Sequence, residues 1–301
     1  MSSLGDCDES NTEEKICKDE DYKEIRKRLN TFYDKEEKKE KDSLNKIIRI
    51  SCKNGQLKIL RYIYDDLIKN AKKHLKLDGY QKSKLCVLQT ACLASNIEIV
   101  SYLLSIGISI GIDFNRINKG LEVCMHEIYY NGHDWNCATL LLENGGDVNL
   151  AYRNPYKTKK KGLKDITLLS IACIKRNYEM VQNLCEKYSA KINEYDILYC
   201  FDDYFYYSPI KYKIIIDEGT KIAEFLIRKC DIGDIDKFLK LLYVKFNKYE
   251  IDDYIFKKVM DMIVKEQKRR KQENIRNLLL IGYRKRPELH QDELREIASF
   301  L

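Results

Sequence analysis

Long hydrophobic runs are missing from this chain of 301 residues. No stretch reaches 18 consecutive apolar residues, which a membrane-spanning helix needs. The opening residues MSSLGDCDES also lack the basic segment followed by an apolar segment that marks a secretory signal. We therefore expect a soluble protein that stays in the cytoplasm and has no membrane partner.

Signatures of catalysis and of metal binding are also absent. The sequence contains no phosphate-binding loop, no dinucleotide fingerprint, no H-E-x-x-H and no G-x-S-x-G. The four histidines are scattered and no C-x-x-C occurs. The nearest acid–base pair is His133 and Asp134, which we interpret as the corner and capping residues at the start of a helix. We therefore expect no enzyme, no cofactor and no metal.

Proline and glycine are scarce, with 3 and 13 residues, which favours a mostly helical protein. Within it, three segments align without a gap: SCKNGQLKIL (51–60), ACLASNIEIV (91–100) and ACIKRNYEMV (172–181). Each places a small residue and a cysteine before a polar corner, and apolar residues at helical spacing after it. The pattern predicts repeated pairs of short helices joined by tight corners.

These residues resemble the ankyrin repeat family. The closest stretches are NGH (131–133) with TLLLENGGDVNLA (139–151), and ITLLSIACIKRNYEMVQNLCEKYSAKIN (166–193). The resemblance covers about residues 43–230 and implies an all-α solenoid of about five irregular ankyrin repeats, followed by a non-repeating helical cap. It also implies a monomeric, non-enzymatic protein that holds a partner protein on its concave face and loop tips.

Cysteine stands at one equivalent position in three repeats, as Cys52, Cys92 and Cys173. A repeated position is a packing position, so we interpret these side chains as small buried apolar groups that remain thiols.

Three insertions lie between the repeats, at about 70–84, 152–165 and 194–207, and such insertions often enlarge a binding face. One carries KTKKKGLK (157–164) and another the aromatic run LYCFDDYFYYSP (198–209). Lysines of this kind also occur on solvated loops, and the aromatic run also fits a helix packed on the fourth repeat. The predicted partner contacts are Tyr152, Arg153, Tyr156, Lys157, Lys159, Lys160, Tyr195, Tyr204, Tyr206 and Tyr207.

The chain ends differ from the middle. Residues 1–20 are acidic and poor in apolar residues, so we expect a disordered tail. Residues 21–42 predict a helix that caps the first repeat, and residues 231–301 predict further helices. A second basic cluster, KEQKRRK (265–271), fits either an acidic partner surface or a solvated helix face. No interleaved aromatic and basic motif is present, so we do not expect nucleic-acid binding.

The last residues, LHQDELREIASFL (289–301), resemble the opening helix of an F-box, or the related segment after ankyrin repeats in poxvirus and intracellular bacterial proteins. The resemblance implies an alternative function, the substrate receptor of a cullin-type ubiquitin ligase, acting in the cytoplasm of a host cell. Leu294, Ile297 and Leu301 would then dock the ligase adaptor, although a plain amphipathic helix gives the same spacing.

Overall fold

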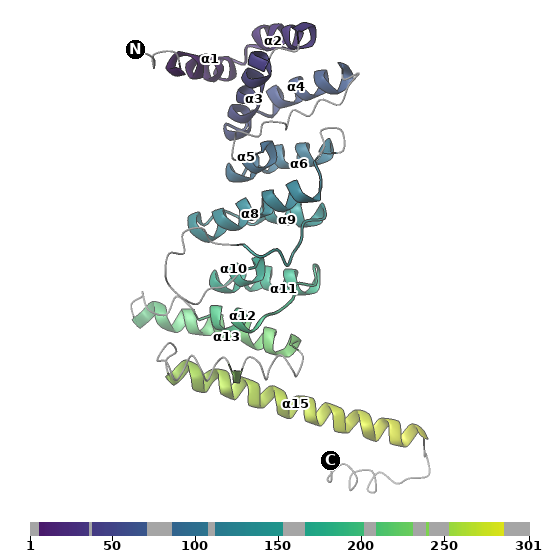
Figure 1. Cartoon of the computed structure of the whole chain (residues 1–301). Helices are drawn as coiled ribbons and strands as arrows, with labels where there is room; N and C mark the ends of the chain where they lie inside the picture. The colour runs from purple at the N-terminus through teal and green to yellow at the C-terminus, as the bar shows by residue number, and fades with distance from the viewer. Residues whose placement is uncertain are drawn as a thin grey trace. The chain divides into compact units, whose positions relative to one another are not determined.

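A computed structural model describes residues 6–35, 38–70, 86–107, 112–152, 166–201, 209–230, 239–240 and 253–285. The chain forms two compact units, residues 1–168 and 169–301. Figure 1 shows the helices in chain order. The expectation of an all-α protein is confirmed at this level, since the described residues are mostly helical and their one β-bridge joins Tyr152 to Ile166.

The first unit consists of helices that follow one another in antiparallel pairs. They are α1 (Asp6–Lys18), α2 (Tyr22–Lys35), α3 (Lys38–Lys53), α4 (Leu57–Asn70), α5 (Val87–Leu93), α6 (Ile97–Ser105), α8 (Phe114–Asn131) and α9 (Asn136–Glu143). The first helix of a pair packs on the first helix of the next, as α1 on α3, α3 on α5 and α5 on α8. Helices α2 with α4 and α6 with α9 form a second layer.

The second unit is described over fewer residues. It contains α10 (Leu168–Ile174), α11 (Tyr178–Glu186), α12 (Glu194–Tyr199), α13 (Pro209–Lys229) and α15 (Asp253–Lys285). Helix α13 contacts α11, α12 and α15. The core of this unit includes Ile222, Leu226 and Val259, which are all fully buried.

Four of the corners between paired helices share one backbone geometry. One residue in each lies in the left-handed region, at Glu20 (φ 48°), Gly55 (φ 75°), Ser95 (φ 51°) and Arg176 (φ 54°). The amide after it donates to the carbonyl five residues earlier: Asp21 to Ile16 at 3.0 Å, Gln56 to Ser51 at 2.8 Å, Asn96 to Ala91 at 3.1 Å and Asn177 to Ala172 at 3.0 Å. This bond closes a helix end tightly enough for the chain to reverse. The three aligned segments are therefore one repeated structure.

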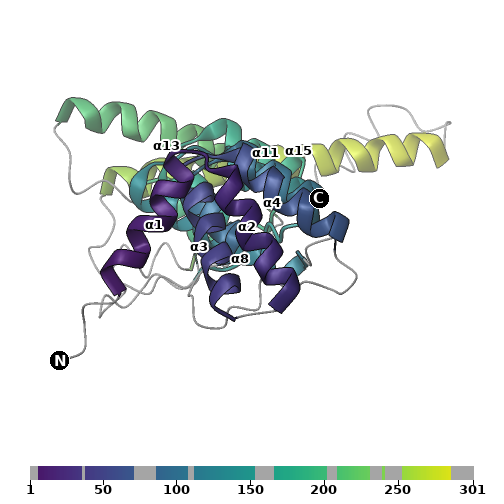
Figure 2. The same ribbon diagram turned by 90° about the horizontal axis from the view of Figure 1, so that it is seen from above.

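The corner at Glu20 follows a segment that we expected to be a disordered tail. Residues 6–18 instead form α1, in which Ile16 is 5% exposed and Cys17 is fully buried. Cys17 occupies the position of Cys52 and Cys92, and ICKDEDYKEI (16–25) aligns with SCKNGQLKIL without a gap. Figure 2 shows α1 and α2 lying against α3. The expectation of disorder fails for residues 6–18, because α1 and α2 are a further helix pair.

A buried carboxylate joins this pair to α3. Glu13 of α1 lies 3.4 Å from Arg28 Nη1 of α2, and Ser43 of α3 donates to the same Glu13 oxygen at 3.2 Å. Arg28 Nε also donates to Glu24 at 3.2 Å. Because Glu13 is 5% exposed, removal of either partner leaves a buried charge less compensated.

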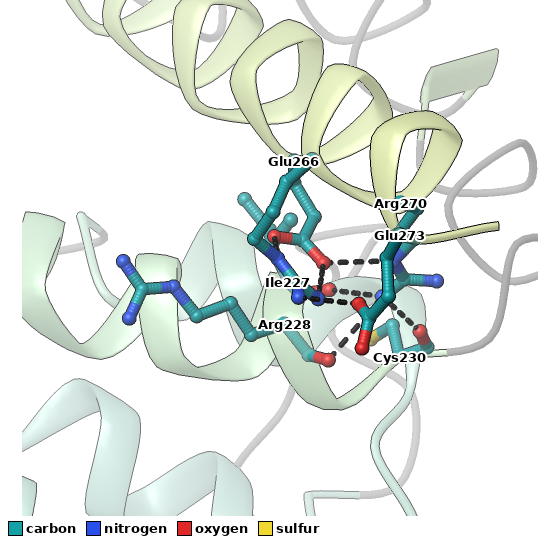
Figure 3. Close-up of polar contacts among 7 residues, drawn as sticks. Ile227, Arg228, Cys230, Glu266, Arg270 and Glu273 are labelled. Atoms are coloured by element: carbon teal, nitrogen blue, oxygen red, sulfur yellow. Dashed lines mark hydrogen bonds and ion pairs between the residues drawn. The ribbon is translucent and has the colours of Figure 1, made fainter. Parts of the chain in front are cut away.

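In the second unit, Arg270 of α15 binds the C-terminal end of α13 (Figure 3). Its Nη2 donates to the carbonyls of Ile227 at 3.0 Å and Cys230 at 2.6 Å, and its Nε donates to Glu266 at 2.8 Å. The last carbonyls of a helix have no partner within the helix, and a guanidinium satisfies several of them at once. This contact fixes α15 on α13.

The same site gives a prediction of pH dependence. Hydrogen bonding from Arg269, with a further bond from Arg270, lowers the pKa of Glu266 from 4.5 to about 2. The stabilisation by Glu266 is therefore complete above about pH 4.5 and is lost as the pH falls toward about 2. In melting curves across this window, we expect the Glu266→Gln variant to have a lower melting temperature than the parent above about pH 4.5. The difference between the two melting temperatures should shrink as the pH falls toward about 2. A difference that does not change with pH would contradict this assignment.

Candidate partner-binding surface

Aromatic rings gather on the last two turns of α8. Asp113 caps the start of this helix by accepting from the Arg116 amide at 2.9 Å, and Gly132, with φ 68°, ends it. The ring centroids of His126 and Tyr130 lie 4.8 Å apart, and those of Tyr129 and Tyr130 lie 4.7 Å apart in an edge-to-face arrangement. Tyr130 is 42% exposed. The end of α8 therefore presents aromatic surface to solvent.

Tyr152 extends this cluster from a different part of the chain. Its ring lies 6.2 Å from the His126 ring, again edge to face. Its backbone forms the antiparallel bridge with Ile166, in which the Tyr152 amide donates at 2.8 Å and the Ile166 amide donates at 3.3 Å. We call His126, Tyr129, Tyr130 and Tyr152 the ring surface. The bridge means that the insertion of residues 153–165 leaves and rejoins the described chain beside this surface.

The carboxylate of Glu127 holds the end of α8 in place. It is 5% exposed and stands where the other repeats have Ser51 or Ala91, although this corner is one residue longer. Its Oε1 lies 2.9 Å from His126 Nδ1, and Asn131 donates to its Oε2. Because a buried carboxylate needs such donors, His126 is fixed against Glu127. The imidazole ring is thereby held within the ring surface.

His133 connects the carboxylate of Glu127 to the corner between α5 and α6. The Ser95 hydroxyl lies 2.6 Å from His133 Nδ1, and Glu127 Oε2 lies 3.8 Å from that same nitrogen. A nucleophilic relay needs the serine on one ring nitrogen and the carboxylate on the other. The three residues therefore link two corners and are not arranged as a catalytic triad.

Asp134, the sequence neighbour of His133, acts at the start of α9. Its Oδ1 accepts from the Asn136 amide at 3.0 Å, one residue position into the helix. The interpretation of His133 and Asp134 as corner and capping residues agrees with this geometry.

The cysteines behave as packing groups. Cys52, Cys92 and Cys173 are at most 1% exposed, and all three are free thiols. Burial raises the pKa of Cys52 and of Cys137 to about 12, so both remain thiols at neutral pH. Among the residues that the structure describes, no group of three or more histidine, cysteine or acidic side chains has an arrangement that could hold a metal ion.

Two of the partner contacts predicted from the sequence can be located. Tyr152 belongs to the ring surface, whereas Tyr195 lies in the second unit, in the first turn of α12, with its ring 6.3 Å from that of Tyr199. The others lie outside the described residues: Arg153, Tyr156, Lys157, Lys159, Lys160, Tyr204, Tyr206, Tyr207, Leu294, Ile297 and Leu301.

Three members of the ring surface were not predicted. His126, Tyr129 and Tyr130 precede the corner in the run HEIYYNGH (126–133). The signal available in the sequence was the pair of tyrosines shortly before Gly132, because a glycine there is typical of a helix end.

Comparison with known proteins identifies one segment. The family model of the ankyrin repeat matches residues 164–194, which contain α10, the corner at Arg176 and α11. No curated protein and no solved structure matches the chain. Ankyrin repeats are in general modules for protein–protein interaction. No helix of the described ranges is both long enough and apolar enough to span a bilayer.

Proposed function

We propose that this protein binds a partner protein without catalysing a reaction, and that the ring surface with the adjoining insertion is the main contact site. The observation that carries the proposal is the bridge between Tyr152 and Ile166, which brings both ends of the insertion beside the rings of α8. One partner would then contact the aromatic residues of the ring surface and the basic residues of the insertion.

The rings suit recognition for a physical reason. Tyrosine provides a large contact area and a hydroxyl group while losing little side-chain entropy, and it is enriched among residues that dominate binding. The edge-to-face contacts and the bond from His126 to Glu127 hold these rings before a partner arrives. Pre-ordered side chains lower the entropic cost of association.

The insertion adds charge to this surface. Residues 153–165, RNPYKTKKKGLKD, carry six basic residues against one acidic residue. Cationic side chains near a contact site increase the rate at which an acidic partner associates, and salt screens the effect. Of the predicted contacts in this insertion, Arg153, Lys157, Lys159 and Lys160 supply such charge.

The site can be tested with a photoreactive amino acid placed at Tyr130, followed by irradiation in cell extract. A matched control carries the same group at Tyr254, which is 55% exposed in the second unit. We expect a discrete cross-linked protein from position 130, which Tyr152→Ala in the same chain reduces, and none from position 254. Equal products from both positions would contradict the site.

Once the partner is purified, Tyr130→Ala should weaken its binding by about tenfold or more, as expected when a central tyrosine is truncated. The reason is loss of ring area that is already positioned in the free protein. Titration calorimetry would measure the change, with Tyr254→Ala as the control of unchanged affinity. Equal affinity of parent and Tyr130→Ala protein would remove the ring surface from the interface.

The ubiquitin-ligase alternative stays a prediction from the sequence of residues 289–301, as do action in a host cell and the number of ankyrin repeats. The ligase alternative can be tested by comparing how much of the ligase subunits is recovered with the full chain and with a chain that ends at residue 286. Equal recovery by both would exclude docking through Leu294, Ile297 and Leu301.

A further inference from the structure

The buried carboxylate of Glu127 has two histidines as its ion-pair partners in the part of the chain that the structure describes. Its oxygens lie 2.9 Å from His126 Nδ1 and 3.8 Å from His133 Nδ1. Asn131 also donates to this carboxylate, but as a neutral amide. While both histidines are neutral, no positive charge offsets the carboxylate, and an uncompensated charge is costly to bury.

The helices that pack on α8 within the first unit bring no cation to this carboxylate. Helix α5 contains no acidic or basic residue, and α9 contains only Glu143, which is its last residue. Asp134, at the start of α9, adds a negative charge. The other titratable groups of these two helices are the thiols of Cys92 and Cys137, which burial keeps neutral. Positive charge at Glu127 therefore depends on the two histidines.

Both histidines can exchange protons with solvent, because their side chains are 30% and 35% exposed. Histidine is the side chain whose charge ordinarily changes between about pH 8 and pH 5. A carboxylate only accepts hydrogen bonds, so His126 Nδ1 already carries a proton in its contact with Glu127. The proton gained at lower pH therefore enters at Nε2 and converts this hydrogen bond into a stronger, charge-assisted one.

Neighbouring charges act on His126 in opposite directions. The insertion of residues 153–165, which begins directly after Tyr152, carries six basic residues against one acidic residue and opposes a new positive charge. Glu122, one turn before His126 on α8, favours it, as does Glu127. Glu127 acts from 2.9 Å in a buried position, whereas salt limits interactions through solvent to about 8 Å. The attraction by Glu127 therefore decides the sign.

We propose that the ring surface responds to pH, and that proton uptake by His126 and His133 fixes the end of α8 and makes this surface more positive. The charged His126 would lie 4.8 Å from the Tyr130 ring, where an aromatic ring attracts a cation. His133 would tie the corner at Ser95, 2.6 Å away, to the same carboxylate. An acidic partner then binds more tightly as the pH falls, a consequence that rests on the function proposed above.

The test follows the melting temperature of the protein from about pH 7.5 to about pH 5.5. The double variant His126→Gln with His133→Gln keeps hydrogen-bonding amides that cannot become charged. Its melting temperature should fall further below that of the parent, by about 3 °C or more, because lower pH favours a folded state that binds more protons. Glu127→Gln should show the same growing difference. The control, His74→Gln with His290→Gln, removes the other two histidines and should follow the parent.

A difference from the parent that stays constant with pH, in the double variant or in Glu127→Gln, would overturn the proposal. Cross-linking from position 130 at both pH values measures the effect on binding. We expect at least about threefold more product at the lower pH from the parent, and no increase from the double variant. Product that does not increase would overturn the effect on binding. If position 130 gives no product at either pH, the proposed contact site fails, whereas the melting curves still decide the response to pH.

Discussion

Replacement of Cys92 by aspartate is expected to unfold the first unit. Cys92 is 1% exposed on α5, where α8 approaches so closely that a Cβ on Gly120 would lie 3.3 Å from the Cys92 sulfur. Contact with the Cys124 thiol and burial raise the pKa of Cys92 well above its ordinary value, so this position disfavours negative charge. An aspartate there costs at least several kcal/mol, comparable with the whole stability of a domain.

The measurement is thermal unfolding followed by circular dichroism. Cys86→Asp is a matched control, because Cys86 is the N-cap of α5 and its side chain accepts from the Gln89 amide. Aspartate is a preferred N-cap residue, so this variant should be as stable as the parent or slightly more stable. Cys92→Ala should lose only about 1 kcal/mol through a small cavity. A Cys92→Asp protein with the parental melting temperature would refute the repeat alignment.

The repeats could be predicted because their buried positions are few and chemically distinctive. Cys52, Cys92 and Cys173 stand beside Ser51, Ala91 and Ala172, and all six side chains are buried against neighbouring helices. Small side chains pack well where helices approach this closely, so packing favours one residue pattern in these three copies. The corner geometry then follows from the backbone, even where Ser95 or Arg176 takes the left-handed conformation in place of glycine.

The first copy was missed because charge conceals its pattern. In ICKDEDYKEI, Ile16, Cys17 and Ile25 are buried, while most of the other residues are charged. Its corner residue, Glu20, takes φ 48° and gives none of the local signal that Gly55 gives. A charged composition favours disorder when it is averaged along the chain. Three apolar side chains at the repeat spacing are nevertheless enough to hold the helix pair in place, because α3 supplies the surface against which they pack.

The ring surface could be predicted only in part. Tyr152 was selected because it begins a basic insertion, but its neighbour His126 lies far from it in sequence and comes from another helix. Contacts of this kind depend on how α8 ends and on the bridge between Tyr152 and Ile166, which no local pattern specifies. Helix α15 shows the same limit, because the sequence does not distinguish engaged arginines from exposed lysines.

Replacement of Cys17 by aspartate separates a folded first pair from a disordered tail. Cys17 is fully buried, and its sulfur lies 3.7 Å from both the Ile47 carbonyl and the Ser51 hydroxyl of α3. Neither group is a cation, so a carboxylate there would be desolvated without an ion partner, at a cost of several kcal/mol. We expect α1 to detach from α3, with a lower melting temperature and faster amide exchange in α1 and at Ile47 and Ile48 of α3.

The control for this variant is Lys15→Asp, an exposed position on the same helix. It should cost no more than about 1 kcal/mol, because an acidic residue near a helix C-terminus opposes the helix dipole only weakly when exposed. If residues 6–18 did not pack on α3, both variants would unfold like the parent and Ile47 would keep its exchange rate. A loss confined to Cys17→Asp therefore requires the buried contact of Cys17, and with it a helix pair before the segment that resembles ankyrin repeats.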